Sequence, residues 1–428
     1  MTHLLIILLL LLPLPSRAAE FAIATGTANT GTGNTDYTVS GFGTPACAMV
    51  FATYGTADGT AVDHGGVAIG ATDGTNQLSL MGASENGQTA ADVGGAQNTS
   101  DTFRMVTAAA QATTEGTASG SLITDGVRLN TTDAFAAAYQ VKALLIGGSG
   151  VAGCTVGSVT TGGVLDGSVT VNTVGFTADV ILFWSLSDTS STPSSNGLSF
   201  GVCVRSATSC ATQYGYSFND VSSANPTQVQ QMLNTDGVTR RVSGGVNGAL
   251  AEIGNIGASG FDVTQRDNAT AVTLQYLAID LNGIGAAMIT DASPTSTGSE
   301  AITGAGFTPQ FALGLYGTAV ANDTFYSDGN AESWGIGLMT ASTSACVGMT
   351  SDDNVSPSNT ESLTNSIALC LRKDGALFQA ASLTSFDSDG MTLNNTTANG
   401  TARQRIFLFI EAGAAASSRT RQMPVFYP

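Results

Sequence analysis

The chain has 428 residues, of which 43% are hydrophobic and 11% are charged, and its formal net charge is −18. A disordered chain would carry more charge and fewer apolar residues, so this composition excludes that class and indicates folded, β-rich domains. The excess of acidic groups repels phosphate backbones, which disfavours nucleic-acid binding, and the length suits roughly two to four domains.

Residues 1–18 have the pattern of a secretory signal peptide. An apolar run from Leu4 to Leu12 precedes small residues at Ser16 and Ala18. The run is too short to cross a bilayer, and no later stretch is long and apolar enough to do so. We therefore expect cleavage before Ala19, a secreted or extracellular protein, and no membrane span. The first three residues contain no Lys or Arg, so an uncleaved anchor and a misassigned start codon stay open as alternatives.

Three sets of glycines recur along the chain at a spacing of about 130 residues, which indicates a threefold repeat of domain size. One set opens a Gly-Phe turn before an apolar strand, one lies inside an apolar strand, and one precedes the closing strand of each repeat. In that order the sets are Gly41, Gly175 and Gly306; Gly70, Gly201 and Gly337; and Gly126, Gly260 and Gly390.

Within each repeat, short β-branched or aromatic segments alternate with Gly, Asn, Asp, Ser and Thr turns. This pattern predicts an all-β protein of three tandem antiparallel β-sandwich domains, jelly-roll-like in form. A short helix or turn is considered only at Gln228 to Leu233. We place the repeats at 19–150, 160–288 and 298–413, followed by a C-terminal tail at 414–428. Gly/Ser/Thr-rich linkers are expected at 147–163 and 289–299.

All six cysteines follow the predicted leader, and an even number in an exported protein indicates disulfides. One pair is close enough in sequence to bridge a tight loop, a second would join facing strands, and the remaining two would tie the first repeat to the following linker. Other pairings and reduced, buried cysteines stay open. The favoured pairs are Cys203–Cys210, Cys346–Cys370 and Cys47–Cys154.

Few residues are candidates for chemistry. His64 lies in an Asp-His-Gly-Gly turn, where a solvated loop histidine is favoured over a catalytic one. Asp387 and Asp389 could form an acid/base pair, but Asp389 precedes glycine in a turn dipeptide, which favours a structural role. The segment 351–354 offers oxygen ligands for calcium without the spacing of a calcium loop.

Three aromatic residues could stack on sugars, although filling of the core is the favoured interpretation of Tyr214, Tyr216 and Trp334. The scattered glycines form no phosphate-binding loop, and the near absence of histidine argues against a zinc site. The sequence therefore predicts no catalytic residue, no metal and no cofactor.

The Gly-Phe-Thr-Pro opening and the segment from Ser385 to Leu393 resemble a repeat of tandem-repeat proteins found in bacteriophage and environmental viral genomes. The match covers residues 30–413 and is best in the third repeat, where Met391 replaces the usual phenylalanine. In the second repeat, Asp262 follows the Gly-Phe pair instead of preceding it. The resemblance implies a virion or surface-structural role and supplies no catalytic residues.

Together these features predict a secreted or particle-associated structural or binding protein without catalysis. It would be a component of a virion, a filament or a cell surface, and it would self-associate or assemble into a larger particle. Surface glycans are a further candidate partner. The alternative is a secreted carbohydrate-binding or carbohydrate-active protein, in which Asp387 and Asp389 would serve an enzyme.

Overall fold

The computed structural model describes residues 19–108, 113–186, 196–243, 246–267, 270–327, 331–373 and 376–413. The predicted leader at 1–18 and the tail at 414–428 lie outside these ranges. The described residues form strands and turns, with no helix among them, so the prediction of an all-β fold is confirmed. Among the same residues, no helix is long and apolar enough to cross a membrane.

Three units of the same design follow one another. Unit one comprises β1 (Glu20–Thr27), β2 (Gly33–Thr38), β3 (Cys47–Ala52), β4 (Val62–Asp63), β5 (Gly65–Thr72), β6 (Gln77–Ser84), β7 (Val93–Asn98), β8 (Phe103–Val106), β9 (Thr114–Ile123), β10 (Gly126–Asp133) and β11 (Gln140–Gly147). Unit two comprises β12 (Gly153–Thr160), β13 (Ser168–Val171), β14 (Val180–Ser185), β15 (Asn196–Ser206), β16 (Ser209–Asp220), β17 (Val229–Asn234), β18 (Thr239–Ser243), β19 (Val246–Gly257), β20 (Gly260–Arg266) and β21 (Thr273–Asp280). Unit three comprises β22 (Ala286–Ala292), β23 (Gly298–Thr303), β24 (Pro309–Gly317), β25 (Ala331–Thr340), β26 (Ser344–Asp352), β27 (Thr360–Asn365), β28 (Leu369–Lys373), β29 (Ala376–Asp387), β30 (Gly390–Thr397) and β31 (Gln404–Glu411).

Each unit is an antiparallel sandwich of a six-stranded and a four-stranded sheet, which confirms the predicted fold class. In unit one the strand orders are β1-β11-β3-β5-β6-β7 and β2-β10-β9-β8. Unit two repeats them as β12-β21-β14-β15-β16-β17 and β13-β20-β19-β18, and its two sheets also join through the pair Ser209 and Asn255. Unit three repeats them as β22-β31-β24-β25-β26-β27 and β23-β30-β29-β28.

Both linker predictions are wrong, and the short helix considered at Gln228 to Leu233 is not present. The expected linkers at 147–163 and 289–299 contain β12 and most of β22. These are the first strands of units two and three, and they pair with β21 and β31. The segment from Gln228 to Leu233 is the extended strand β17, which pairs with β16. Its side chains are buried on both faces, and this burial holds a segment extended that its sequence left ambiguous.

The six-stranded sheets are covered on both faces. Inside each sandwich, a separate hydrophobic core lies between the two sheets. A fourth core is shared by all three units and contains Phe51, Trp184 and Trp334. Strands such as β3 are therefore buried at every residue, as continuous apolar strands with two covered faces should be.

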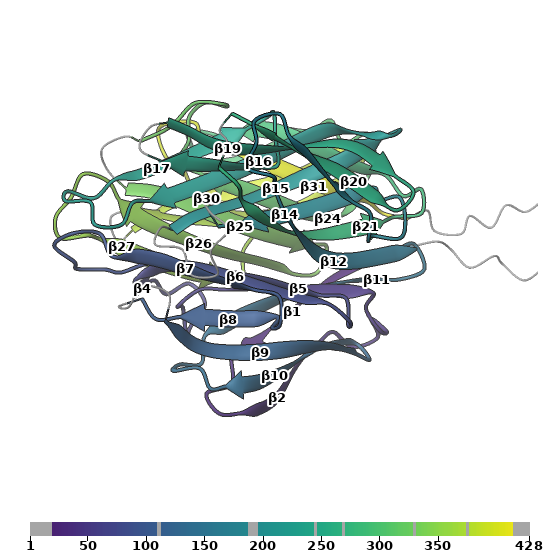
Figure 1. The fold of residues 1–428 in the computed structure, drawn as a ribbon, viewed down its shortest axis with the longest axis horizontal. Coiled ribbons are helices and arrows are strands. Elements are labelled where there is room, and N and C mark those ends of the chain that lie inside the picture. The colour runs from purple at the N-terminus through teal and green to yellow at the C-terminus, as the bar shows by residue number, and fades with distance from the viewer. Residues whose placement is uncertain are drawn as a thin grey trace, which may run out of the picture.

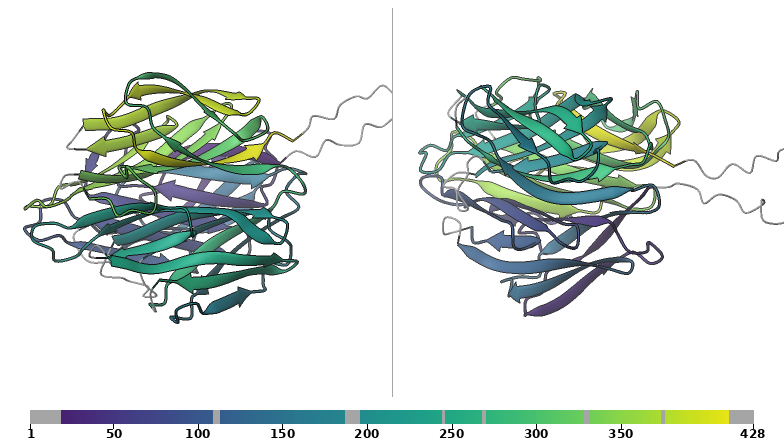
Figure 2. Two further views of the ribbon diagram at one scale, coloured as in Figure 1. Left: turned by 90° about the horizontal axis from the view of Figure 1, so that it is seen from above. Right: turned by 45° about the vertical axis from the view of Figure 1, so that its right-hand side comes forward.

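The three units pack side by side (Figures 1 and 2). The shared core lies where they meet, and equivalent strands make the contacts from one unit to the next. Strand β5 of unit one contacts β26 and β27 of unit three, the equivalent β15 contacts β6 and β7 of unit one, and the equivalent β25 contacts β17 of unit two. The contacts thus close a ring, which gives the single chain a pseudo-threefold axis. One such contact stacks Phe21 on Phe311, with ring centroids 4.7 Å apart.

The outer edge of each six-stranded sheet meets a segment from the neighbouring unit. Strand β4 of unit one pairs with β27 of unit three, and Tyr326 of unit three forms a bridge with Gln231 on β17 of unit two. In the third case, Leu186 of unit two lies against Gly95 on β7 of unit one. Covering these edges removes exposed strand backbone that could pair with other chains.

Candidate functional site

The repeat glycines that defined the sequence pattern have structural roles. A Cβ on Gly70, Gly201 or Gly337 would overlap the carbonyl oxygen of the segment entering the four-stranded sheet of the same unit. Glycine at these positions lets the two sheets approach closely. Gly175 serves differently, because its φ of 83° places it in the left-handed region. The strongest sequence signal therefore encodes packing of the sandwich.

Asp389, one of the candidate acid/base residues, holds a turn. Its Oδ1 accepts the N–H of Gly306 at 2.6 Å and its Oδ2 accepts the N–H of Gly304 at 3.1 Å. Asp125 accepts the N–H of Gly43 in the same way in unit one, and the hydrogen bonds from Gly43 and Gly41 lower its pKa. The favoured structural interpretation of Asp389 agrees with these contacts.

Asp387 accepts hydrogen bonds from two hydroxyls of its own hairpin, Ser385 at 2.8 Å and Thr392 at 2.6 Å. Of the candidate aromatic residues, Tyr216 and Trp334 are fully buried in the shared core, and Tyr214 packs partly buried against it. The core-filling interpretation of Tyr216 and Trp334 is therefore confirmed, and neither presents a face to a sugar.

The histidine and the calcium candidate both lie where units meet. His64 is half-buried. Its backbone N–H donates to the carbonyl of Thr360 in unit three, and its ring Nδ1 accepts the backbone N–H of Asn86. The expectation of a solvated loop histidine is thus only partly right. Asp353 accepts the N–H of Val229 at 2.9 Å, which ties unit three to unit two. Over the described ranges, no three His, Cys, Asp or Glu side chains group as metal ligands would.

The three disulfides are the pairs that the sequence favoured. Cys203–Cys210 joins neighbouring strands of unit two, and Cys346–Cys370 joins the two sheets of unit three. Cys47–Cys154 connects β3 to β12 and therefore links unit one covalently to unit two. All six cysteines are disulfide-bonded, and none is left as a nucleophile.

Three equivalent loops close a ring at one end of the pseudo-threefold axis. These axial loops are residues 85–92, 221–228 and 353–359, which connect β6 to β7, β16 to β17 and β26 to β27. Each loop donates one backbone hydrogen bond to the next and receives one in return. The forward bonds run from Ala91 N to Ala224 O (2.9 Å), from Thr227 N to Val355 O (2.9 Å) and from Ser358 N to Gln88 O (2.7 Å); the return bonds run from Ser223 N to Ala91 O, from Asn354 N to Thr227 O and from Gly87 N to Ser358 O.

A buried polar cluster, the axial triad, lies beneath these loops. Its members are Ser84, Asp220 and Ser351. Each follows, by the same number of residues, the strand residue that pairs with the glycine inside the apolar strand of its unit (Gly70, Gly201 or Gly337). All three are buried, the Ser351 hydroxyl donates to Asp220 Oδ2 at 2.7 Å, and Ser84 also hydrogen-bonds this carboxyl. Burial, reinforced by the nearby charge of Asp353, raises the pKa of Asp220 to about 6.

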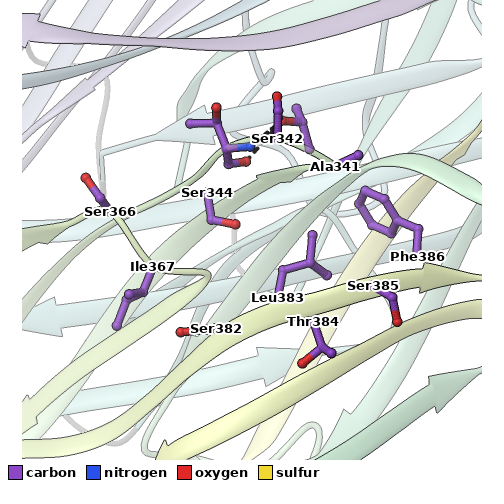
Figure 3. A pocket seen from close by; sticks show the side chains of 12 residues that line it. Ala341, Ser342, Ser344, Ser366, Ile367, Ser382, Leu383, Thr384, Ser385 and Phe386 are labelled. Atoms are coloured by element: carbon purple, nitrogen blue, oxygen red, sulfur yellow. Dashed lines mark hydrogen bonds between the residues drawn. The ribbon is translucent and has the colours of Figure 1, made fainter.

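A cleft of about 240 Å³ opens between the two sheets of unit three (Figure 3). It is formed by the turn from Thr340 to Ser344, by Ser366 and Ile367, and by the segment from Ser382 to Phe386 of β29. Figure 3 shows hydroxyl groups and the Phe386 ring around this space. Its lining contains no charged side chain.

Sequence reasoning missed both the axial triad and the cleft. Serine, threonine and leucine carry no signal by themselves, and an alignment of the three repeats position by position would have been needed to show where one unit departs from the others. Neither a known protein-family model nor a curated protein matches this chain.

Proposed function

We propose that this protein is a non-enzymatic structural component of an extracellular or particle-surface assembly, in which one chain takes the place of a trimer. The observation that carries the proposal is the closed ring of equivalent contacts between the three units. Homologous contacts that close through a rotation are the means by which cyclic oligomers form, and here the three protomers are fused in one chain.

The use of the sheet faces supports this proposal. A repeat that served as a ligand-binding module would keep an equivalent surface free in every copy. Here the outer face of each six-stranded sheet is instead buried in the shared core, where Trp184 and Trp334 are fully buried. The residues that define the repeat serve turns and close sheet packing, as Gly201 and Asp389 do. An enzyme built on Asp387 and Asp389 would need carboxylates that are not already used by the hairpin and the turn.

The two ends of the described sandwiches differ, and three disulfides favour a secreted setting. Glu20 pairs with Gly147 at one end of the sheets, and Glu411, at the end of β31, is the counterpart of Gly147 in unit three. The axial loops lie at the opposite end, because β6 and β16 end there at Ser84 and Asp220, and β26 ends there one residue after Ser351. The described part of the chain therefore has two different ends, with the axial loops at one and the start of β1 and the end of β31 at the other. Three disulfides favour an oxidising compartment.

The test is mass spectrometry of source material separated into a sedimenting particle fraction and a soluble fraction. We expect peptides of this chain to be enriched in the particles, with an N-terminal peptide that begins at Ala19. Imaging of the particles by electron microscopy should then show compact heads with apparent threefold symmetry. Recovery of the chain in the soluble fraction alone would contradict the structural proposal.

A further inference from the structure

The three units provide an internal comparison at the open end of each sandwich. In unit one, Gln77 bridges the two sheets: its Oε1 accepts the N–H of Gly120 at 3.0 Å and the hydroxyl of Thr102 at 3.1 Å. In unit two, Gln213 does the same, since its Oε1 accepts the N–H of Ile253 at 2.8 Å and its Nε2 donates to the carbonyl of that residue at 3.4 Å. A glutamine thus closes both sandwiches.

Unit three has a serine at this position. Gln77, Gln213 and Ser344 each lie two residues before the strand residue that pairs with the glycine inside the apolar strand of that unit. Those glycines are Gly70, Gly201 and Gly337. The serine side chain is shorter by the length of an amide arm and cannot span the gap between the sheets. Ser344 instead lines the cleft of about 240 Å³ (Figure 3). The cleft is therefore a specific departure of one repeat from the pattern that the other two keep.

The residues that line the cleft indicate which class of ligand it would bind. Residues with hydroxyl groups line the cleft from two segments, Ser342 in the turn before β26 and Ser382 and Thr384 on β29, and a hydroxyl can both donate and accept. Leu383 and Phe386 add an apolar surface beside them. A lining without charge, with several hydroxyl-bearing residues and one aromatic ring, favours a neutral ligand that is itself rich in hydroxyls. The volume lies below the range of about 300–1,000 Å³ of sites for drug-sized ligands, which limits the ligand to one or two small rings.

We propose that this cleft is a binding site for a neutral saccharide, filled by one or two sugar rings. The ring hydroxyls exchange hydrogen bonds with the serine and threonine side chains, and the apolar face of a sugar packs on Phe386. Each chain carries one such site, so binding by a single molecule is weak and becomes strong where many copies are held together. The proposal is independent of the structural role, because it depends only on unit three.

Saturation-transfer NMR of the full chain tests the site. The probes are glucose, galactose, mannose, N-acetylglucosamine, cellobiose and chitobiose, each added to the wild type and to two variants. Ser344→Gln restores the glutamine that closes the other two units, and we expect it to weaken binding about tenfold or more. Ser168→Gln, the same change at an exposed position on the edge strand β13, is the matched control and should bind as the wild type does.

The melting temperature of Ser344→Gln should be equal to or above that of the wild type, because the new amide can bridge the sheets. Should this variant fail to fold, Thr384→Val removes an exposed hydroxyl of the cleft at nearly constant volume and should weaken binding in its place. The proposal is overturned if none of the six saccharides binds the wild type. It is equally overturned if binding persists unchanged in a folded Ser344→Gln or Thr384→Val variant.

Discussion

Replacing Asp220 with asparagine should stabilise the protein above neutral pH. Asp220 is the one carboxyl in the axial triad, where both other units have serine. The unfolded chain would ionise this group at its ordinary pKa of 3.8, whereas burial raises the pKa to about 6 in the fold. The folded state therefore holds the proton more tightly, and the stability present at low pH is lost as the pH rises through the folded pKa.

The difference between these two pKa values corresponds to about 3 kcal/mol. Asparagine has nearly the same shape, carries no charge, and can still hydrogen-bond the hydroxyls of Ser84 and Ser351. We expect Asp220→Asn to be more stable than the wild type by up to about 3 kcal/mol near pH 8, and the two proteins to converge near pH 4. Because the two proteins differ at one residue, the pH-dependent part of their difference reports on Asp220 together with its charged neighbour Asp353.

Urea unfolding of both proteins across this pH range measures the effect. Asp133→Asn, the same substitution at an exposed position, is the matched control and should leave stability unchanged at every pH. A difference between Asp220→Asn and the wild type that does not vary with pH would refute a buried carboxyl of raised pKa. So would an asparagine variant that is the less stable protein at pH 8.

Three further predictions concern the packing of the units, and unfolding in urea measures each. Gly201→Ala should lower the free energy of unfolding by about 3 kcal/mol or more, because the new methyl group overlaps a backbone carbonyl. Gly175→Ala should lower it by only about 1 kcal/mol, because alanine there has an unfavourable left-handed backbone conformation but no such overlap. Equal costs would contradict the close approach of the sheets. Replacing both Cys47 and Cys154 with serine removes a crosslink that spans 107 residues and should lower the free energy of unfolding by about 4 kcal/mol. No change would mean that packing alone holds unit one against unit two. Thr227→Val removes a hydroxyl that donates to the carbonyl of Asp352 at the end of β26 and accepts the N–H of Val355 in the next axial loop. This change should lower the free energy of unfolding by about 1–3 kcal/mol, and a neutral effect would show that these two hydrogen bonds add no net stability.

The sequence predicted the features that depend on local backbone geometry. A left-handed φ at Gly175 and the close approach of the Val238 carbonyl at Gly201 both leave glycine as the residue that fits, so glycine recurs at these places in the repeat. The pairing of Cys203 with Cys210 is likewise set by a short separation. The two linker predictions failed for the opposite reason, because β12 consists largely of Gly, Ser and Thr and is a strand only through its pairing with β21.

The sequence could not show what covers the outer faces of the sheets. The apolar strands β3 and β14 indicate burial on both faces, but the same pattern would suit a sandwich packed against a partner chain. Only the arrangement of all three units shows that the repeats cover one another. The cleft was hidden in a similar way, because Ser344 becomes informative only beside Gln77 and Gln213.

Fusing the three units in one chain allows positions on the axis to differ. In a trimer of identical chains, an aspartate at the position of Asp220 would occur three times around the axis. Three carboxyl groups would then meet in a buried site, where the repulsion of like charges strongly opposes their ionisation. Here one carboxyl meets the hydroxyls of Ser84 and Ser351 instead. The same freedom lets Ser344 open unit three while Gln77 and Gln213 keep the other units closed. A single-chain pseudo-trimer can therefore keep threefold packing and still differ at one position of one unit, which a symmetric trimer of identical chains cannot do.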